Sequence, residues 1–115
     1  MMTVKVKNTG ELIATNVKGA DNPYTRVMGL MFKPNMNGMG GLMLDPCNSI
    51  HTFFMRFPID VVFINKENVV VKVHRSLSPW RMTWLYFKAR KTLELPAGSL
   101  PESVKEGVQL EVVSV

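Results

Sequence analysis

The stretch DVVFINKENVVVKVH, residues 60–74, predicts a β-hairpin and sets the fold class of the chain. Residues 60–65 and 69–74 are rich in β-branched and aromatic side chains, which favour strands. Three residues join them, and the last of the three, Asn68, tolerates the left-handed backbone conformation that such a loop requires. The sequence therefore places β structure at the centre of the fold.

Shorter elements are predicted on both sides of this hairpin. Residues 3–7 and 12–17 alternate apolar and polar side chains around a turn, a pattern typical of a second hairpin. Asn22 and Pro23 together resemble a helix start, so we expect a helix of about ten residues after them. The remaining predicted strands cover residues 41–44, 50–57, 92–95 and 108–113.

These elements together predict a mainly β (α+β) fold. Six to seven short strands would form a small antiparallel β-barrel or roll, and the single helix would cover one end or one face of it. The chain has 115 residues, of which 46% are hydrophobic and 20% charged, a composition typical of globular proteins. A chain of this length supports one hydrophobic core, and we expect one domain over residues 1–115.

Net charge, cysteine content and the search for targeting signals indicate which partners and which compartment suit the chain. The formal net charge of +5 favours anionic partners. The N-terminal residues lack the apolar core of a signal peptide, and no apolar stretch is long enough to span a bilayer. Cys47 is the only cysteine, so no intramolecular disulfide can form, and a reducing compartment suits it. We expect a soluble, cytoplasmic protein with no transmembrane segment.

Four sequence blocks carry a more specific signal. They are RVMGLM at residues 26–31, GLML at 41–44, IHTFFMRFPIDVVFI at 50–64 and LELPAG at 93–98. Their order and spacing resemble the signatures of domain-of-unknown-function family 192, also called uncharacterised protein family 0127, from about Thr3 to Val115. The resemblance implies a small β-rich domain of bacteria and archaea with no established activity, substrate or cofactor, and we expect a bacterial protein. Many relatives are exported or anchored to a membrane, which we do not expect here.

Three polar residues interrupt the most apolar part of the chain. His51, Arg56 and Asp60 lie within or beside residues 53–64, where an unpaired charge would be costly to bury. In one interpretation Arg56 and Asp60 form an ion pair at the Pro58 corner, and His51 bonds a backbone carbonyl. In the other, Arg56 binds a carboxylate or phosphate group next to His51. The residue types alone are compatible with both.

Two other groups of residues could support chemistry. Cys47 and His51 supply the residue types of a nucleophile–base pair, although no glycine turn or oxyanion-binding loop surrounds the cysteine. The alternative is a buried, inert thiol. Met36 and Met39, in a glycine-rich loop, are soft ligands suited to Cu(I), and ordinary packing or exposure in the loop is their alternative. We predict no catalytic residue, no metal and no cofactor.

The segment 72–91 is basic and aromatic. No acidic residue occurs between Glu67 and Glu94, and six Lys or Arg residues in this interval alternate with Trp, Tyr and Phe. Such a segment suits an anionic surface or polymer, or a protein partner. Nucleic acid is a less favoured partner because no RNA- or DNA-binding signature accompanies the segment. A loop packed over the end of the barrel is the alternative.

The sequence favours a small non-catalytic binding or accessory domain with a basic, aromatic-lined surface for an anionic small molecule, polymer or protein partner. In this interpretation Arg56 binds the anionic group, Asp60 orients Arg56, and the two tryptophans supply apolar contact. A Cys/His-dependent hydrolase or transferase is one alternative, and an interaction protein that docks through residues 72–91 is another. The candidate ligand-binding residues are Arg26, His51, Arg56, Asp60, Trp80 and Trp84.

Overall fold

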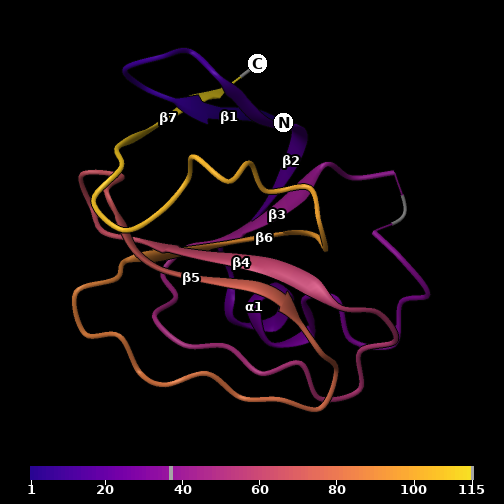
Figure 1. Ribbon diagram of the computed structural model, residues 1–115. Coiled ribbons are helices and arrows are strands. Elements are labelled where there is room, and N and C mark those ends of the chain that lie inside the picture. The colour runs from indigo at the N-terminus through magenta and orange to yellow at the C-terminus, as the bar shows by residue number, and fades with distance from the viewer. Residues whose placement is uncertain (37, 115) are drawn as a thin grey trace.

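The computed structural model describes residues 1–36 and 38–114 and confirms the mainly β fold (Figure 1). Both predicted hairpins are present, and Asn68 has the expected left-handed backbone, with φ of 64°. In chain order the elements of these residues are β1 (Met2–Val6), β2 (Leu12–Ala20), α1 (Pro23–Met28), β3 (Gly41–Leu44), β4 (Ile59–Ile64), β5 (Val70–Leu77), β6 (Lys91–Pro96) and β7 (Leu110–Ser114).

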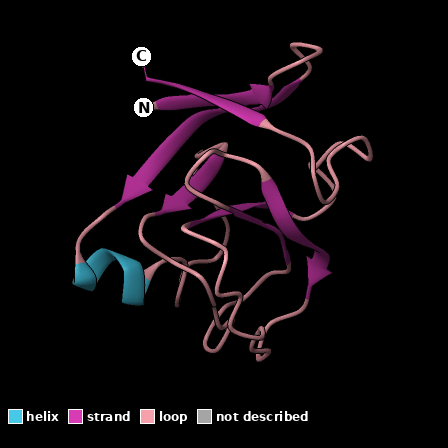
Figure 2. Cartoon of the chain, turned by 90° about the vertical axis from the view of Figure 1, so that its left-hand side faces the viewer, coloured by secondary structure: helices cyan, strands magenta, loops and turns pink. Residues whose placement is uncertain are grey.

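The strands form one curled sheet in the order β5-β4-β6-β3-β2-β1-β7. Neighbouring strands are antiparallel except β2 and β3, which run parallel. At one corner the sheet curls back on itself: Val69 pairs with Gln109, and the Val70 N–H donates to the Val108 carbonyl at 2.8 Å. The result is the predicted roll, with both termini at one end and α1 towards the other (Figure 2).

Both faces of the central strands are covered. All six residues of β4 are buried, which explains why this strand is continuously apolar apart from one acid. Val62 and Leu93 belong to a first hydrophobic cluster. Val61 and Phe63 belong to a second cluster on the opposite face, because successive side chains of a strand point to opposite sides. A polar side chain on either face of these strands is therefore removed from bulk water.

Asp60 is one such polar residue, and it anchors the loop that follows β6. Its carboxylate accepts three backbone N–H bonds, from Ser76 at 2.8 Å and from Gly98 and Leu100 at 3.0 Å each. The predicted ion pair with Arg56 is not among those formed by residues 1–36 and 38–114. Backbone donors already satisfy the Asp60 oxygens, and Arg56 is exposed.

The strand predicted at residues 50–57 is wrong, because this segment is an irregular loop. His51 forms a single bridge with Met82. The Thr52 hydroxyl donates to the Ser78 carbonyl at 2.7 Å and accepts the Arg81 N–H at 2.8 Å, so the segment is tied to a distant loop. Phe54 then adopts a φ of 64°, which a regular strand does not allow.

The helix α1 is shorter than predicted. The Asn22 side chain caps it by accepting the Thr25 N–H at 2.8 Å, as the sequence predicts. Gly29 ends the helix after six residues, and its φ of 43° is one that L side chains rarely adopt. The chain then turns inward and buries Leu30 in the second hydrophobic cluster.

Candidate functional site

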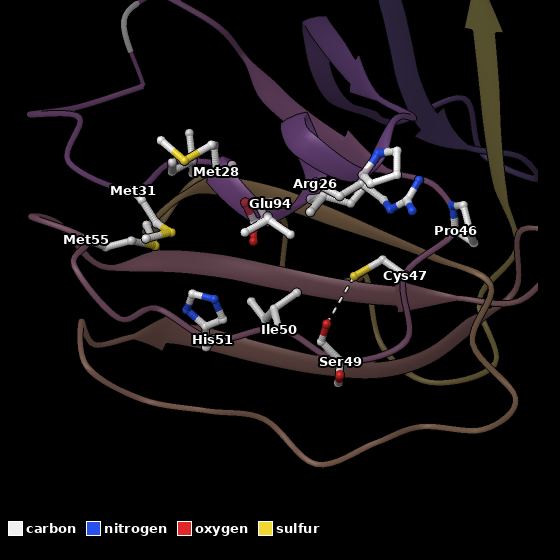
Figure 3. A pocket seen from close by; sticks show the side chains of 15 residues that line it. Arg26, Met28, Met31, Pro46, Cys47, Ser49, Ile50, His51, Met55 and Glu94 are labelled. Carbon is white, nitrogen blue, oxygen red and sulfur yellow. Dashed lines mark hydrogen bonds between the residues drawn. The ribbon is translucent and has the colours of Figure 1, made fainter.

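A pocket of about 270 Å³ lies between α1, the loop that follows β3, and β6 (Figure 3). Methionines form much of its apolar wall, with Met28, Met31 and Met55 reaching it from two different segments. A largely apolar cavity with a few convergent polar groups is the usual form of a small-molecule site. The polar side chains that line it are Arg26, Cys47, Ser49, His51 and Glu94.

Glu94 is buried at the inner wall of this pocket. Leu93 and Leu95 face the first hydrophobic cluster, so strand alternation turns Glu94 to the opposite face. It lies between Leu42 of β3 and Val61 of β4 and is only 4% exposed. Its carboxyl group points towards the pocket and has no hydrogen-bond or ion-pair partner among the residues that the structure describes (Figure 3).

Burial raises the pKa of the Glu94 carboxyl group to about 8. The cause is desolvation, which penalises the ionised form far more than the neutral one. At neutral pH the group therefore keeps its proton and presents an O–H donor together with a carbonyl acceptor. A neutral carboxyl group of this kind can donate to an oxygen atom of a bound molecule.

Arg26 supplies positive charge to the pocket. It lies in the last turn of α1 and is half-buried. Its Nη1 donates to the Asp21 carbonyl at 2.8 Å, which orients the guanidinium and leaves its other N–H groups for a ligand. None of the ion pairs in the described part of the chain involves it.

His51 adds a third donor. Its Nδ1 accepts the Phe53 N–H at 3.3 Å, so in the neutral ring the proton resides on Nε2. The imidazole also stacks on the Phe53 ring, with centroids 5.0 Å apart, and this contact restricts its orientation. The structural interpretation of the sequence had His51 bonded to a backbone carbonyl, whereas Nδ1 instead accepts a backbone N–H.

The pocket thus combines donors of three kinds with an apolar wall. The Glu94 O–H, the Arg26 guanidinium and the His51 Nε2–H all suit acceptor oxygens, and the guanidinium adds charge attraction for an anion. The methionine thioethers offer contact to an apolar ligand body and adapt readily to its shape. This arrangement can hold a small molecule that carries a carboxylate or phosphate group.

Cys47 lines the same pocket but is not activated. Its Sγ donates to the Ser49 carbonyl at 3.1 Å. Burial raises the pKa of the thiol, and this effect outweighs the hydrogen bonds and the Arg26 charge that act in the opposite direction. Since the thiolate is the nucleophile, the pocket disfavours Cys47 chemistry at neutral pH.

We expect the folded protein to react slowly with iodoacetamide at pH 7, at well under a tenth of the rate of an unhindered thiol, because little thiolate is present. Unfolding in denaturant should restore the ordinary rate, which serves as the internal control. Mass spectrometry of timed samples measures both rates. Fast labelling of folded protein would contradict this account and favour the hydrolase or transferase alternative.

The fold brings only some of the predicted ligand-binding residues together. Arg26 and His51 meet at the pocket. Asp60 lies on the face of β4 that also carries Val62, opposite to Glu94. The other three predicted residues, Arg56, Trp80 and Trp84, are exposed and do not line the pocket.

Glu94 is the residue that sequence reasoning missed as a pocket group. An acid flanked by Leu93 and Leu95 in a predicted strand is compatible with an exposed face, so the pattern alone does not place it in the interior. For Met36 and Met39 the sequence left two alternatives, Cu(I) ligands or ordinary packing and exposure in the loop. Met36 is buried in the second hydrophobic cluster, and Met39 packs against that cluster. Both are packing residues.

None of the helices in the described residues is both long enough and apolar enough to cross a membrane.

Two solved structures of bacterial proteins are similar to this one, and the likeness shows the fold alone. One is a putative transcription regulator from Sinorhizobium meliloti, with a TM-score of 0.79 and 22% identity over 96% of this chain and 91% of the other. The second is a protein of unknown function from Novosphingobium aromaticivorans, with a TM-score of 0.79 and 18% identity over 96% and 82% of the two chains.

Sequence comparison identifies relatives at higher identity. A UPF0127 protein of Pyrococcus furiosus is 38% identical over 106 residues, which cover 89% of this chain and 90% of the relative. A UPF0127 protein of Thermococcus sibiricus is 35% identical over 96 residues, and the match spans only 62% of that relative. Both sources are archaeal, so these relatives do not support the expected bacterial source. The sequence model of domain-of-unknown-function family 192, described as "Uncharacterized ACR", matches residues 4–112. The chain therefore belongs to this uncharacterised family.

Proposed function

We propose that the protein is a non-catalytic binding domain whose pocket takes a small organic anion. The observation that carries the proposal is the buried Glu94 carboxyl group, which faces the pocket without a hydrogen-bond partner among the described residues. The only fully enclosed side-chain N or O atom without a partner among the described residues is Asn68 Oδ1, so the Glu94 oxygens open to the pocket, where a ligand can bond to them.

The charged and hydrogen-bonding groups around the pocket indicate which class of ligand it would bind. Arg26 attracts the anionic group, and the His51 Nε2–H together with the protonated Glu94 carboxyl donates to its oxygens. The methionine wall contacts the rest of the molecule, which is small because the pocket is about 270 Å³. Arg56 was the anion-binding residue favoured by the sequence, and this role passes to Arg26, which lines the pocket.

A thermal-shift screen of small carboxylates and organic phosphates tests the proposal. A ligand present at a hundred times its Kd stabilises a protein by about 2.7 kcal/mol, which raises the Tm of a domain of this size by several degrees. We expect a hit to be lost in R26M and retained in R56M, a matched control that removes the same charge from an exposed position. Affinity should also fall as pH rises through 8, because Glu94 then loses its donor proton.

Two results would overturn the proposal. One is a panel in which no carboxylate or phosphate raises the Tm of the wild-type protein. The other is a hit that binds R26M as tightly as it binds the wild type, because the ligand would then lie elsewhere. Thermal unfolding of each variant without ligand shows that the fold is intact before binding is compared.

A further inference from the structure

A second surface of the molecule is built from residues 78–88, here called the aromatic loop. This loop lies at the edge of the molecule that is farthest from the two termini in Figure 1, beside the loop of residues 48–54. Both tryptophans of the chain belong to it. Its large side chains point to solvent to an unusual degree, with Trp84 78% and Phe87 83% exposed. Met82 and Trp80 are also exposed.

The backbone of the aromatic loop explains why these side chains face outwards. The Thr83 N–H donates to the Ile50 carbonyl, and the Thr83 hydroxyl accepts the Ile50 N–H at 2.9 Å, so Thr83 turns inwards. The residues on either side, Met82 and Trp84, then point away from the protein. The Tyr86 N–H donates to the Asn48 carbonyl and fixes the loop again near its end. The outward display is therefore held in place by hydrogen bonds on the inner side.

Exposed rings from two other segments extend this surface. The Phe54 ring lies 4.7 Å from the Trp80 ring and 5.3 Å from the Phe32 ring, measured between centroids. All three residues have φ near 65°, a left-handed conformation that is costly for a bulky side chain. Glycine or asparagine would adopt it more easily. The backbone therefore does not favour aromatic side chains at these positions; their rings contact one another and remain exposed as one patch.

The charge next to the exposed rings is positive and unneutralised. Of the cations in residues 72–91, Lys72 pairs with Glu106 and Arg90 pairs with Asp45. Arg75 donates to three backbone carbonyls, at Leu100, Pro101 and Val104. By contrast, Arg81 and Lys88 of the aromatic loop are exposed, as is Arg56 beside it, and none of the three takes part in an ion pair of the described residues.

We propose that the aromatic loop docks the protein on an anionic lipid bilayer. Tryptophan and phenylalanine beside methionine suit the boundary between headgroups and acyl chains, while Arg81 and Lys88 suit anionic headgroups. Thioether and aliphatic side chains among the rings fit an acyl layer better than a nucleic-acid strand, which would stack on rings alone. A patch of large apolar side chains is otherwise a liability for a protein in water. The loop contacts the pocket-lining residues Ile50 and His51, but this proposal does not rest on the function proposed for the pocket.

The two tryptophans make the test direct, because fluorescence excited selectively in tryptophan, and not in Tyr24 or Tyr86, reports on the aromatic loop alone. We expect a blue shift of emission and co-sedimentation with vesicles that contain phosphatidylglycerol, and much weaker binding to vesicles of phosphatidylcholine alone. The double variant W84A/F87A should lower the vesicle partition coefficient at least tenfold. L12S/V113S, which changes exposed apolar side chains of β2 and β7, should leave it unchanged.

Charge variants separate the electrostatic contribution. R81Q/K88Q should lose the preference for anionic vesicles, whereas K7Q/K105Q, with the same net charge at exposed positions outside the loop, should keep it. The proposal is overturned if anionic vesicles neither shift the emission nor sediment the protein, or if W84A/F87A binds them like the wild type. Quenching by a single-stranded oligonucleotide without vesicle binding would also overturn it and assign the loop to nucleic acid.

Discussion

Replacing Asp60 by alanine is expected to destabilise the protein by about 3 kcal/mol, because three backbone N–H groups lose their acceptor at once. The Leu100 N–H is fully buried and suffers most, since no water replaces the carboxylate there. The loss should lower the Tm by roughly 10 °C for a domain of this size. Urea unfolding of wild type and D60A measures the difference in free energy.

A matched control separates this effect from the loss of any acidic side chain. Asp45 forms an exposed ion pair with Arg90 at 3.1 Å, and such pairs contribute under about 1 kcal/mol. D45A should therefore unfold close to the wild type. If D60A and D45A were equally mild, the Asp60 carboxylate would not hold the loop after β6, and its assignment as an anchor would fail.

Replacing Glu94 by glutamine is expected to stabilise the protein at pH 8 by roughly 4 kcal/mol and at pH 5 by less than about 1 kcal/mol. The carboxyl pKa is about 8 in the folded protein, against a usual value of 4.5. Between these two values the folded state holds more protons than the unfolded state, so wild-type stability decreases as pH rises through this window. Above pH 8 the penalty is complete and the curve flattens.

The E94Q amide is neutral at all these pH values and has nearly the same shape, so it removes the proton-linked part of the curve. Burial also lowers the pKa of His74, which contributes its own pH dependence in both proteins. The difference between the wild-type and E94Q curves of free energy against pH therefore isolates Glu94. Parallel curves from pH 5 to pH 8.5 would contradict the raised pKa.

The hairpins and the roll could be predicted because they follow from local patterns. Strand alternation and β-branched content identify β4 and β5, and the asparagine in the third loop position identifies the turn between them. The helix start was equally local, since the Asn22 side chain caps the helix by accepting the N–H of Thr25, only three residues along the chain. Its end depended on the backbone of Gly29, which the apolar spacing of the following residues obscured.

The polar residues could not be placed in the same way, because their partners lie far along the chain. Asp60 binds backbone groups up to 40 residues away, so its sequence neighbours suggested Arg56 instead. The Thr52 hydroxyl donates to the Ser78 carbonyl, and a turn forms where the alternating apolar and polar residues predicted a strand. Glu94 faces a pocket because β3 and β4 flank β6 in the sheet, and α1 and the loop after β3 line the space in front of it. Contacts between residues so far apart in the chain produce no periodic pattern in the local sequence.

The most direct test of the account is the titration of the Glu94 carboxyl group itself. Its side-chain carbon can be followed by NMR across the pH range in isotopically labelled protein, with E94Q used to assign the signal. A single midpoint near 8 is the result expected for a buried carboxyl without a partner at the wall of the pocket. A midpoint near the usual 4.5 would show a solvated or paired carboxylate and would contradict the donor-lined pocket on which the proposed function rests.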